Sequence, residues 1–108
     1  MKLFEFKNST ISISMELFFN GKDQLVFKGY DTGSTLDDYR GDSDYEYGFT
    51  IEPQEVRKLY QLLAVHADDK GALLQEIKDR FGGNHAYPKL TAFLEENNID
   101  FKGSVSFP

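Results

Sequence analysis

The strongest constraint on the fold is a change in hydrophobic period partway along the chain. In the segment STISISMELFF, residues 9–19, apolar and polar side chains alternate over positions 11–17. A period of two is typical of a strand with one buried side and one side facing water. Residues 53–63 instead show the helical spacing of three and four, carried by Val56, Leu59, Tyr60 and Leu63. The chain therefore combines a sheet in its first half with helices in its second half.

Turn signals divide the first half into short strands. Asn8–Ser9 closes a first apolar segment that begins at Leu3. Asn20–Gly21 opens the segment NGKDQ, and both residues accept positive φ, which predicts a hairpin at this point. The segment DYEYGFTI then resumes the alternation after an irregular stretch, with Tyr45 and Tyr47 on the apolar side. Four strands are expected, near residues 3–6, 11–19, 24–30 and 44–51.

The second half of the chain predicts three helices and a last strand. Pro53 suits a first helical turn because its missing N–H would be unpaired there, and Glu55 adds negative charge at the positive end of that helix. The segment KGALLQEIKDRF ends at Gly82–Gly83, and a third helix runs from near Tyr87 to Asn97–Asn98. The tail IDFKGSVSF alternates again, as a strand does.

This order of elements predicts the fold class. Strands, then helices, then one strand are typical of an α+β fold, with a mostly antiparallel sheet of about four or five strands and about three helices packed on one face. The length of 108 residues gives room for one domain, residues 1–108.

Composition narrows the class of protein further. The chain has no cysteine, so a disulfide framework and a thiolate zinc site are both excluded. No window approaches 18 apolar residues, and the N-terminal segment lacks the continuous apolar stretch of a secretory signal. A cytoplasmic protein without a membrane partner is expected.

The negative charge is concentrated in one quarter of the sequence. The net charge is −6, yet residues 31–55 hold eight acids and only one base, Arg40. The rest of the chain has a balance of +1. Such a field repels nucleic acid and favours a basic protein or a cation as the partner. The eight acids are Asp31, Asp37, Asp38, Asp42, Asp44, Glu46, Glu52 and Glu55.

No catalytic constellation is evident, and no enzyme activity or cofactor is predicted. The two histidines, His66 and His85, fall in expected loops, and the Gly-x-Ser-x-Gly motif of a nucleophilic serine is absent. Two carboxylates could act as an acid–base pair only if an apolar pocket separated their pKa values. The acidic stretch is rich in Gly, Ser and Asp, so we expect it to be hydrated.

Cation binding is the alternative to a protein partner. The segment DDYRGDSDYE supplies the hard oxygen ligands that calcium prefers. Its spacing does not match the calcium-binding loop of an EF-hand, so no metal ligands are assigned. A cation-binding or regulatory module that uses the acidic loop, residues 31–46, remains a second hypothesis.

The acidic stretch predicts a surface for protein recognition. Tyrosine buries a large area at low entropic cost, and surrounding carboxylates speed the approach of a basic partner. Tyr45 and Tyr47 are expected in the core, which leaves Tyr39 as the exposed ring. A solvated loop is the competing interpretation for each single residue. The predicted partner-binding residues are Asp37, Asp38, Tyr39, Asp42, Asp44 and Glu46.

Three segments in residues 44–108 add a resemblance to a known class. They read DYEYGFTIEPQEVRKLYQLL, LLQEIKDRFGG and LTAFLEENNIDFKGSVSF. This part of the chain resembles the immunity proteins of contact-dependent growth inhibition and other polymorphic toxin systems in bacteria. The resemblance implies a small cytoplasmic inhibitor that binds the C-terminal toxin domain of a secreted effector. It implies no site residues, because such proteins diverge most at the surface that binds the toxin.

The charge of the acidic stretch indicates what kind of toxin would fit. A nuclease has a positive cleft because its substrate is a polyanion, and an acidic inhibitor can occupy that cleft in place of the substrate. The sequence therefore predicts an inhibitor that blocks the active site or substrate groove of a toxin, with a nuclease as the expected class.

Overall fold

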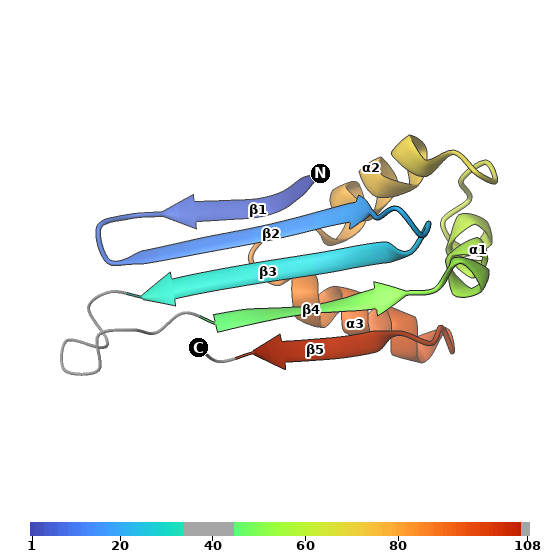
Figure 1. Ribbon diagram of the computed structural model, residues 1–108. Helices are drawn as coiled ribbons and strands as arrows, with labels where there is room; N and C mark the ends of the chain where they lie inside the picture. Colours follow the sequence, from blue (N-terminus) through green and yellow to red (C-terminus); the bar gives the residue numbers. More distant parts are fainter. Residues whose placement is uncertain (34–44, 107–108) are drawn as a thin grey trace.

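The protein is an antiparallel sheet with helices on one face, which confirms the predicted α+β class (Figure 1). The computed structural model describes residues 1–33 and 45–106, and for residues 104–106 the backbone alone. Its elements in chain order are β1 (Lys2–Lys7), β2 (Ile11–Phe19), β3 (Leu25–Gly33), β4 (Tyr45–Ile51), α1 (Pro53–Leu62), α2 (Lys70–Phe81), α3 (Ala86–Glu96) and β5 (Lys102–Ser106).

The five strands lie side by side in the order of the sequence, β1-β2-β3-β4-β5, and every neighbouring pair is antiparallel. The strand β5 follows the three helices in the chain and lies beside β4. Figure 1 shows the helices behind one end of the sheet, whereas the turn between β1 and β2 and the adjoining ends of β3 and β4 extend past them. The three helices described in residues 53–96 therefore do not cover this end of the sheet.

The core lies between the sheet and the apolar faces of the helices. Met15 and Leu17 are buried while Glu16 between them is exposed, as the period of two predicts. Each helix buries residues three or four positions apart, as the helical period predicts. The strand residues of the core include Met15, Leu17, Leu25, Phe27, Tyr47, Phe49 and Ile51, and the helix residues include Val56, Leu59, Tyr60, Leu73, Ile77, Ala86, Leu90 and Leu94.

The hairpin between β2 and β3 differs from the turn that Asn20–Gly21 predicted. Phe19 pairs with Leu25, so the loop has five residues, and positive φ occurs at Asp23 instead of at Asn20 or Gly21. The Asn20 side chain accepts the backbone N–H of Lys22 at 2.9 Å and that of Gln24 at 3.1 Å. The asparagine thus shapes the loop through its side chain, not through its own backbone conformation.

The helices α1 and α3 end in the same hydrogen-bonded motif. After α3, the N–H of Ile99 donates to the carbonyl of Leu94 at 2.9 Å, and Asn98 has a left-handed φ of 56°. After α1, the N–H of Val65 donates to the carbonyl of Tyr60 at 2.9 Å, and Ala64 has a φ of 55°. This pattern is the Schellman motif, in which glycine is the preferred residue at the left-handed position.

The Ala64→Gly variant is expected to be more stable than the wild type by about 0.5–1 kcal/mol. Alanine pays a steric cost in the left-handed region that glycine avoids, and this gain exceeds the larger entropy that glycine loses on folding. The measurement is urea unfolding followed by circular dichroism. The matched control is Ala92→Gly in the exposed interior of α3, which should lose about 1 kcal/mol. Equal destabilisation by both changes would contradict the explanation.

Candidate functional site

Most of the predicted partner-binding residues lie outside the described part of the structure. Asp37, Asp38, Tyr39, Asp42 and Asp44 fall in residues 34–44, and of the six predicted residues only Glu46 is described. Glu46 is exposed near the start of β4, where it lines a shallow hollow of about 170 Å³ together with Lys28 and Thr50. This hollow is on the face of the sheet that the helices leave open.

The described acids of the stretch separate into two groups at opposite ends of β4. Asp31 pairs with Tyr45 and Tyr30 pairs with Glu46, so Asp31 and Glu46 lie at the same end of the sheet and point to opposite faces. Glu52 and Glu55 follow the other end of β4, at the start of α1. The four acids of residues 31–55 that the structure describes therefore do not form one continuous surface.

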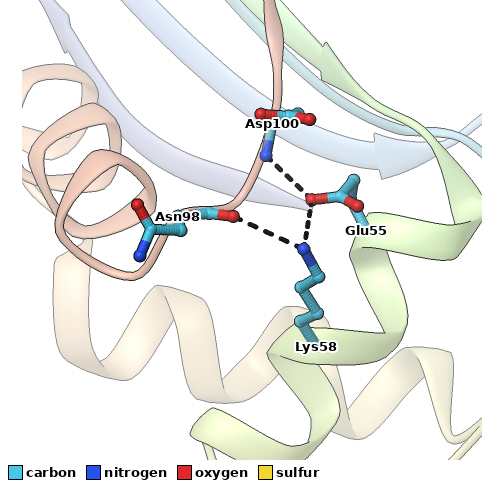
Figure 2. A network of polar contacts seen from close by, with 4 residues as sticks. All are labelled: Glu55, Lys58, Asn98 and Asp100. Carbon is cyan, nitrogen blue, oxygen red and sulfur yellow. Dashed lines mark hydrogen bonds and ion pairs between the residues drawn. The ribbon is translucent and has the colours of Figure 1, made fainter.

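Glu55 has a structural role that its place in the acidic stretch did not predict (Figure 2). Its Oε1 accepts the backbone N–H of Asp100 at 2.9 Å and the ammonium group of Lys58 at 2.9 Å. Lys58 also donates to the carbonyl of Asn98 at 3.4 Å. These bonds tie α1 to the segment between α3 and β5. These bonds lower the pKa of Glu55, and the bond from the Asp100 N–H has a larger effect than the bond from Lys58.

Replacing Glu55 with glutamine is expected to weaken the dependence of the free energy of unfolding on pH in the acid range. The folded-state pKa lies below the ordinary value of 4.5, so the carboxylate stabilises the fold above that value and loses this contribution as the pH falls through the folded pKa. The wild type should lose more stability than Glu55→Gln between about pH 6 and pH 3. Urea unfolding at several pH values measures this, with the exposed Glu95→Gln on α3 as the control. Parallel curves for wild type and Glu55→Gln would contradict the assignment.

A second hollow, of about 230 Å³, lies on the helix-side face of the sheet. The three strands β2, β3 and β4 form its floor, and the start of α3 forms one wall. Three tyrosines and one carboxylate dominate its polar lining. The residues that line it are Ile13, Met15, Asp31, Tyr45, Tyr47, Asn84, Tyr87 and Pro88. We refer to this site as the tyrosine hollow.

The turn before α3 places Tyr87 over the sheet. Gly83 donates its backbone N–H to the carbonyl of Leu3 in β1 at 3.2 Å, which fixes the turn against the sheet edge. Its φ of 114° is a conformation that favours glycine. The carbonyl of Gly83 then accepts the N–H of Ala86, the first residue of α3, at 3.1 Å. Tyr87 follows directly and enters the hollow.

The tyrosine rings pack against one another at the wall of the hollow. The ring centroids of Tyr45 and Tyr47 are 5.3 Å apart. Tyr47 and Tyr87 meet edge to face with their centroids 5.0 Å apart, and Tyr87 also packs on Phe27 of the core at 5.5 Å. Such ring pairs are favourable beyond the area they bury, so the wall is fixed by the core beneath it.

Tyr47 crosses to the neighbouring strand and bonds to Asp31. Gly29 lies directly opposite Tyr47, and a side chain at Gly29 would overlap the Tyr47 ring. The absence of a side chain lets the ring lie over β3 and reach the residue two positions further along the same face. The Tyr47 hydroxyl donates to Oδ1 of Asp31 at 3.1 Å.

Burial changes the acidity of the groups in the tyrosine hollow. Partial burial raises the pKa of Asp31, and the hydrogen bond from Tyr47 opposes part of that rise. Burial, followed by the nearby Asp31 carboxylate, raises the pKa of Tyr47 well above its ordinary value. Burial also raises the pKa of Tyr87. The hollow therefore holds one carboxylate whose ionised form is poorly solvated.

The sequence-based prediction used these residues differently. The sequence alone places Asp31 within the acidic stretch, residues 31–46, predicts Tyr45 and Tyr47 in the core, and indicates no site role for Tyr87. Tyr47 is indeed buried, with 7 % of its surface exposed, while Tyr45 and Tyr87 are half-buried at the surface of the hollow. Asp31 and Tyr45 are paired across β3 and β4 and so lie on the same face. This pairing would indicate the site, but the sequence alone does not determine the β3–β4 register.

The histidines and the possible metal ligands of the described residues do not add a further site. His66 and His85 are both exposed, as expected for loop histidines. Within residues 1–33 and 45–106, no group of three or more His, Asp or Glu residues is placed to hold a metal ion. None of the helices described there is long and apolar enough to cross a membrane. Comparison of the chain with known protein families, curated proteins and solved structures finds no match.

Proposed function

We propose that the protein is an immunity protein that binds a basic bacterial toxin domain and neutralises it. The observation that carries the proposal is the charge at one end of the sheet. Asp31 and Glu46 lie at this end and present carboxylates on both faces. The sequence between them adds four more acids and one base, so residues 31–46 have a balance of −5. A basic partner is the complement of such a surface.

A nuclease is the toxin class that this charge fits best. Its cleft is positive because it binds a polyanion, and an acidic surface can take the place of the substrate backbone there. In this mechanism the protein performs no chemistry. It approaches the toxin by electrostatic attraction and then excludes the substrate from the active site or substrate groove.

The first test is to isolate the partner and measure how salt affects the complex. The protein is used as bait in a lysate of its source bacterium, and the bound material is washed at low and then at high salt. The expected result is a basic toxin fragment that is weakened or lost at high salt, because screening shortens the range of charge attraction. Nuclease activity of that fragment, abolished by adding the protein, would complete the assignment. Recovery of no toxin fragment under either condition would overturn it.

Neutralising three acids of the predicted interface is expected to slow association with the isolated partner by roughly tenfold at low ionic strength. The variant is Asp37→Asn, Asp38→Asn and Asp42→Asn, and the measurement is the association rate by surface plasmon resonance over a series of salt concentrations. The dependence of the rate on salt should weaken as well, because fewer charges attract the partner.

The matched control removes three acids elsewhere with the same change in net charge. Glu95→Gln, Glu96→Gln and Asp100→Asn are exposed positions near the end of α3. This control should associate at nearly the wild-type rate. An equal loss in both triple variants would show that only net charge matters. An unchanged rate for the first variant at low salt would exclude the predicted interface.

A further inference from the structure

We propose that the tyrosine hollow is a receptor for a single arginine side chain of the partner. The inference rests on the proposed function for the identity of the partner, and it is argued from described residues that line the hollow. It goes beyond a general attraction between charged surfaces, because it names one pocket and one chemical group. The guanidinium group would lie against Asp31 and the rings of Tyr45 and Tyr87.

The size of the hollow selects an occupant the size of a side chain. Sites for drug-sized molecules have volumes of about 300–1,000 Å³. The tyrosine hollow has about 230 Å³ and is partly open to solvent. A group that enters from a protein surface fits these dimensions better than a free cofactor does.

The charge of the lining selects a cation. Among the described residues that line the hollow, Asp31 is the one that carries a charge. The described ion pairs of the protein use other acids, so within the described residues no lysine or arginine pairs with Asp31. Its Oδ1 accepts the Tyr47 hydroxyl, and a carboxylate retains further acceptor sites when one is occupied. A cation beside it would complete the pairing.

The tyrosine rings favour guanidinium over ammonium. A planar guanidinium stacks on aromatic faces, is more weakly hydrated than an ammonium, and donates several parallel hydrogen bonds to a carboxylate. Tyr45 and Tyr87 are only half-buried, so their rings are partly accessible from the hollow. Tyr47 links these two rings and holds the carboxylate at the same time.

The row of residues across the sheet suits the aliphatic part of an arginine. Phe6 pairs with Ile13, Ile13 pairs with Asp31, and Asp31 pairs with Tyr45. All four therefore lie on the face of the sheet that carries the tyrosine hollow. Phe6, at one end of this row, is 43 % exposed. An apolar surface next to a carboxylate is the complement of a side chain with an apolar stem and a charged head.

The electrostatics of Asp31 are consistent with a binding role. A raised pKa means that the ionised carboxylate is less favourable in the folded protein than in water, so its charge does not stabilise the fold. An asparagine would accept the same hydrogen bond from Tyr47 without that cost. A bound guanidinium would compensate the poorly solvated carboxylate.

The test is an NMR titration of the full chain with N-acetyl-arginine methylamide as the probe. The neutral isostere N-acetyl-citrulline methylamide is the control ligand. The arginine probe is expected to give saturable shifts of the Tyr45, Tyr47 and Tyr87 ring signals and of the Ile13 methyl signals. The citrulline probe should bind at least about tenfold more weakly, since it lacks the charge that Asp31 and the rings recognise.

Two variants separate this site from general acidity. Asp31→Asn should weaken binding of the arginine probe about tenfold while leaving the melting temperature unchanged or higher. Glu46→Gln removes an acid at the same end of the sheet but on the opposite face, and should bind the probe as the wild type does. Shifts that are absent, that are equal for the two probes, or that survive in Asp31→Asn would overturn the proposal.

The outcome also distinguishes this inference from the proposed function. If a basic toxin is recovered and binds Asp31→Asn as tightly as the wild type, the immunity function stands and the arginine receptor is wrong. If the arginine probe binds as described but the protein neutralises no toxin, the receptor stands and the immunity function is wrong.

Discussion

The Gly48→Ala variant should lose the pairing between β3 and β4, with a loss of stability of about 3 kcal/mol or more. A methyl group at this position would overlap the backbone carbonyl oxygen of Phe27 in the neighbouring strand. A flexible side chain could move aside, but this oxygen belongs to a buried central strand that is paired on both edges. The two strands would have to separate locally, and the hydrogen bonds beside Phe27 would weaken with them.

Urea unfolding of Gly48→Ala measures the loss, and hydrogen exchange of the β3 and β4 amides locates it. Gly21→Ala is the matched control, because a methyl group at Gly21 meets no atom within 4 Å. The control should remain within about 0.5 kcal/mol of the wild type. A Gly48→Ala protein as stable as this control would show that the close approach of the two strands is not required.

The Phe27→Ala variant is expected to lose about 3–5 kcal/mol of stability. Phe27 is only 1 % exposed, and its ring stacks on Phe49 with the centroids 5.1 Å apart and packs on Tyr87 at 5.5 Å. Removing it creates a cavity between the sheet and the start of α3. The free energy of unfolding of a small domain is about 5–15 kcal/mol in total, so this loss is a large part of it.

The same variant should also disturb the tyrosine hollow, because Tyr87 rests on Phe27. Near-ultraviolet circular dichroism of the tyrosines reports that change, and urea unfolding reports the stability. Phe6→Ala, at an exposed position, is the control for stability and should cost less than about 1 kcal/mol. Equal losses for the two phenylalanines would contradict the burial of Phe27 as the cause.

The fold class could be predicted because it depends on local periodicity. The alternation over residues 11–17 determines which side of β2 is buried, and the helical spacing from Val56 onward determines which side of α1 is buried. Pro53 and Gly82 also take the predicted places at the start of α1 and the end of α2. Each of these features depends only on residues that are close together in the sequence.

The tyrosine hollow could not be predicted because it depends on register and on helix placement. Asp31 meets Tyr45 only through the β3–β4 register, and that register spans residues 34–44, for which the sequence gives no turn length. Tyr87 reaches the site because Gly83 bonds to the far strand β1. Charge counting marks residues 31–55 as acidic but does not separate Asp31, which lines the hollow, from Glu55, which links α1 to Asp100.

The position of β5 in the sheet has a consequence for how the chain folds. The strands β1 to β4 pair with sequence neighbours, so their contacts close short loops and can form early. Glu46 pairs with Ser106, and that contact must wait until the three helices between them have been synthesised. Until β5 docks, the edge of β4 that faces it has unpaired backbone N–H and C=O groups. An open strand edge of this kind is able to pair with a strand of another chain, and the docking of β5 closes it.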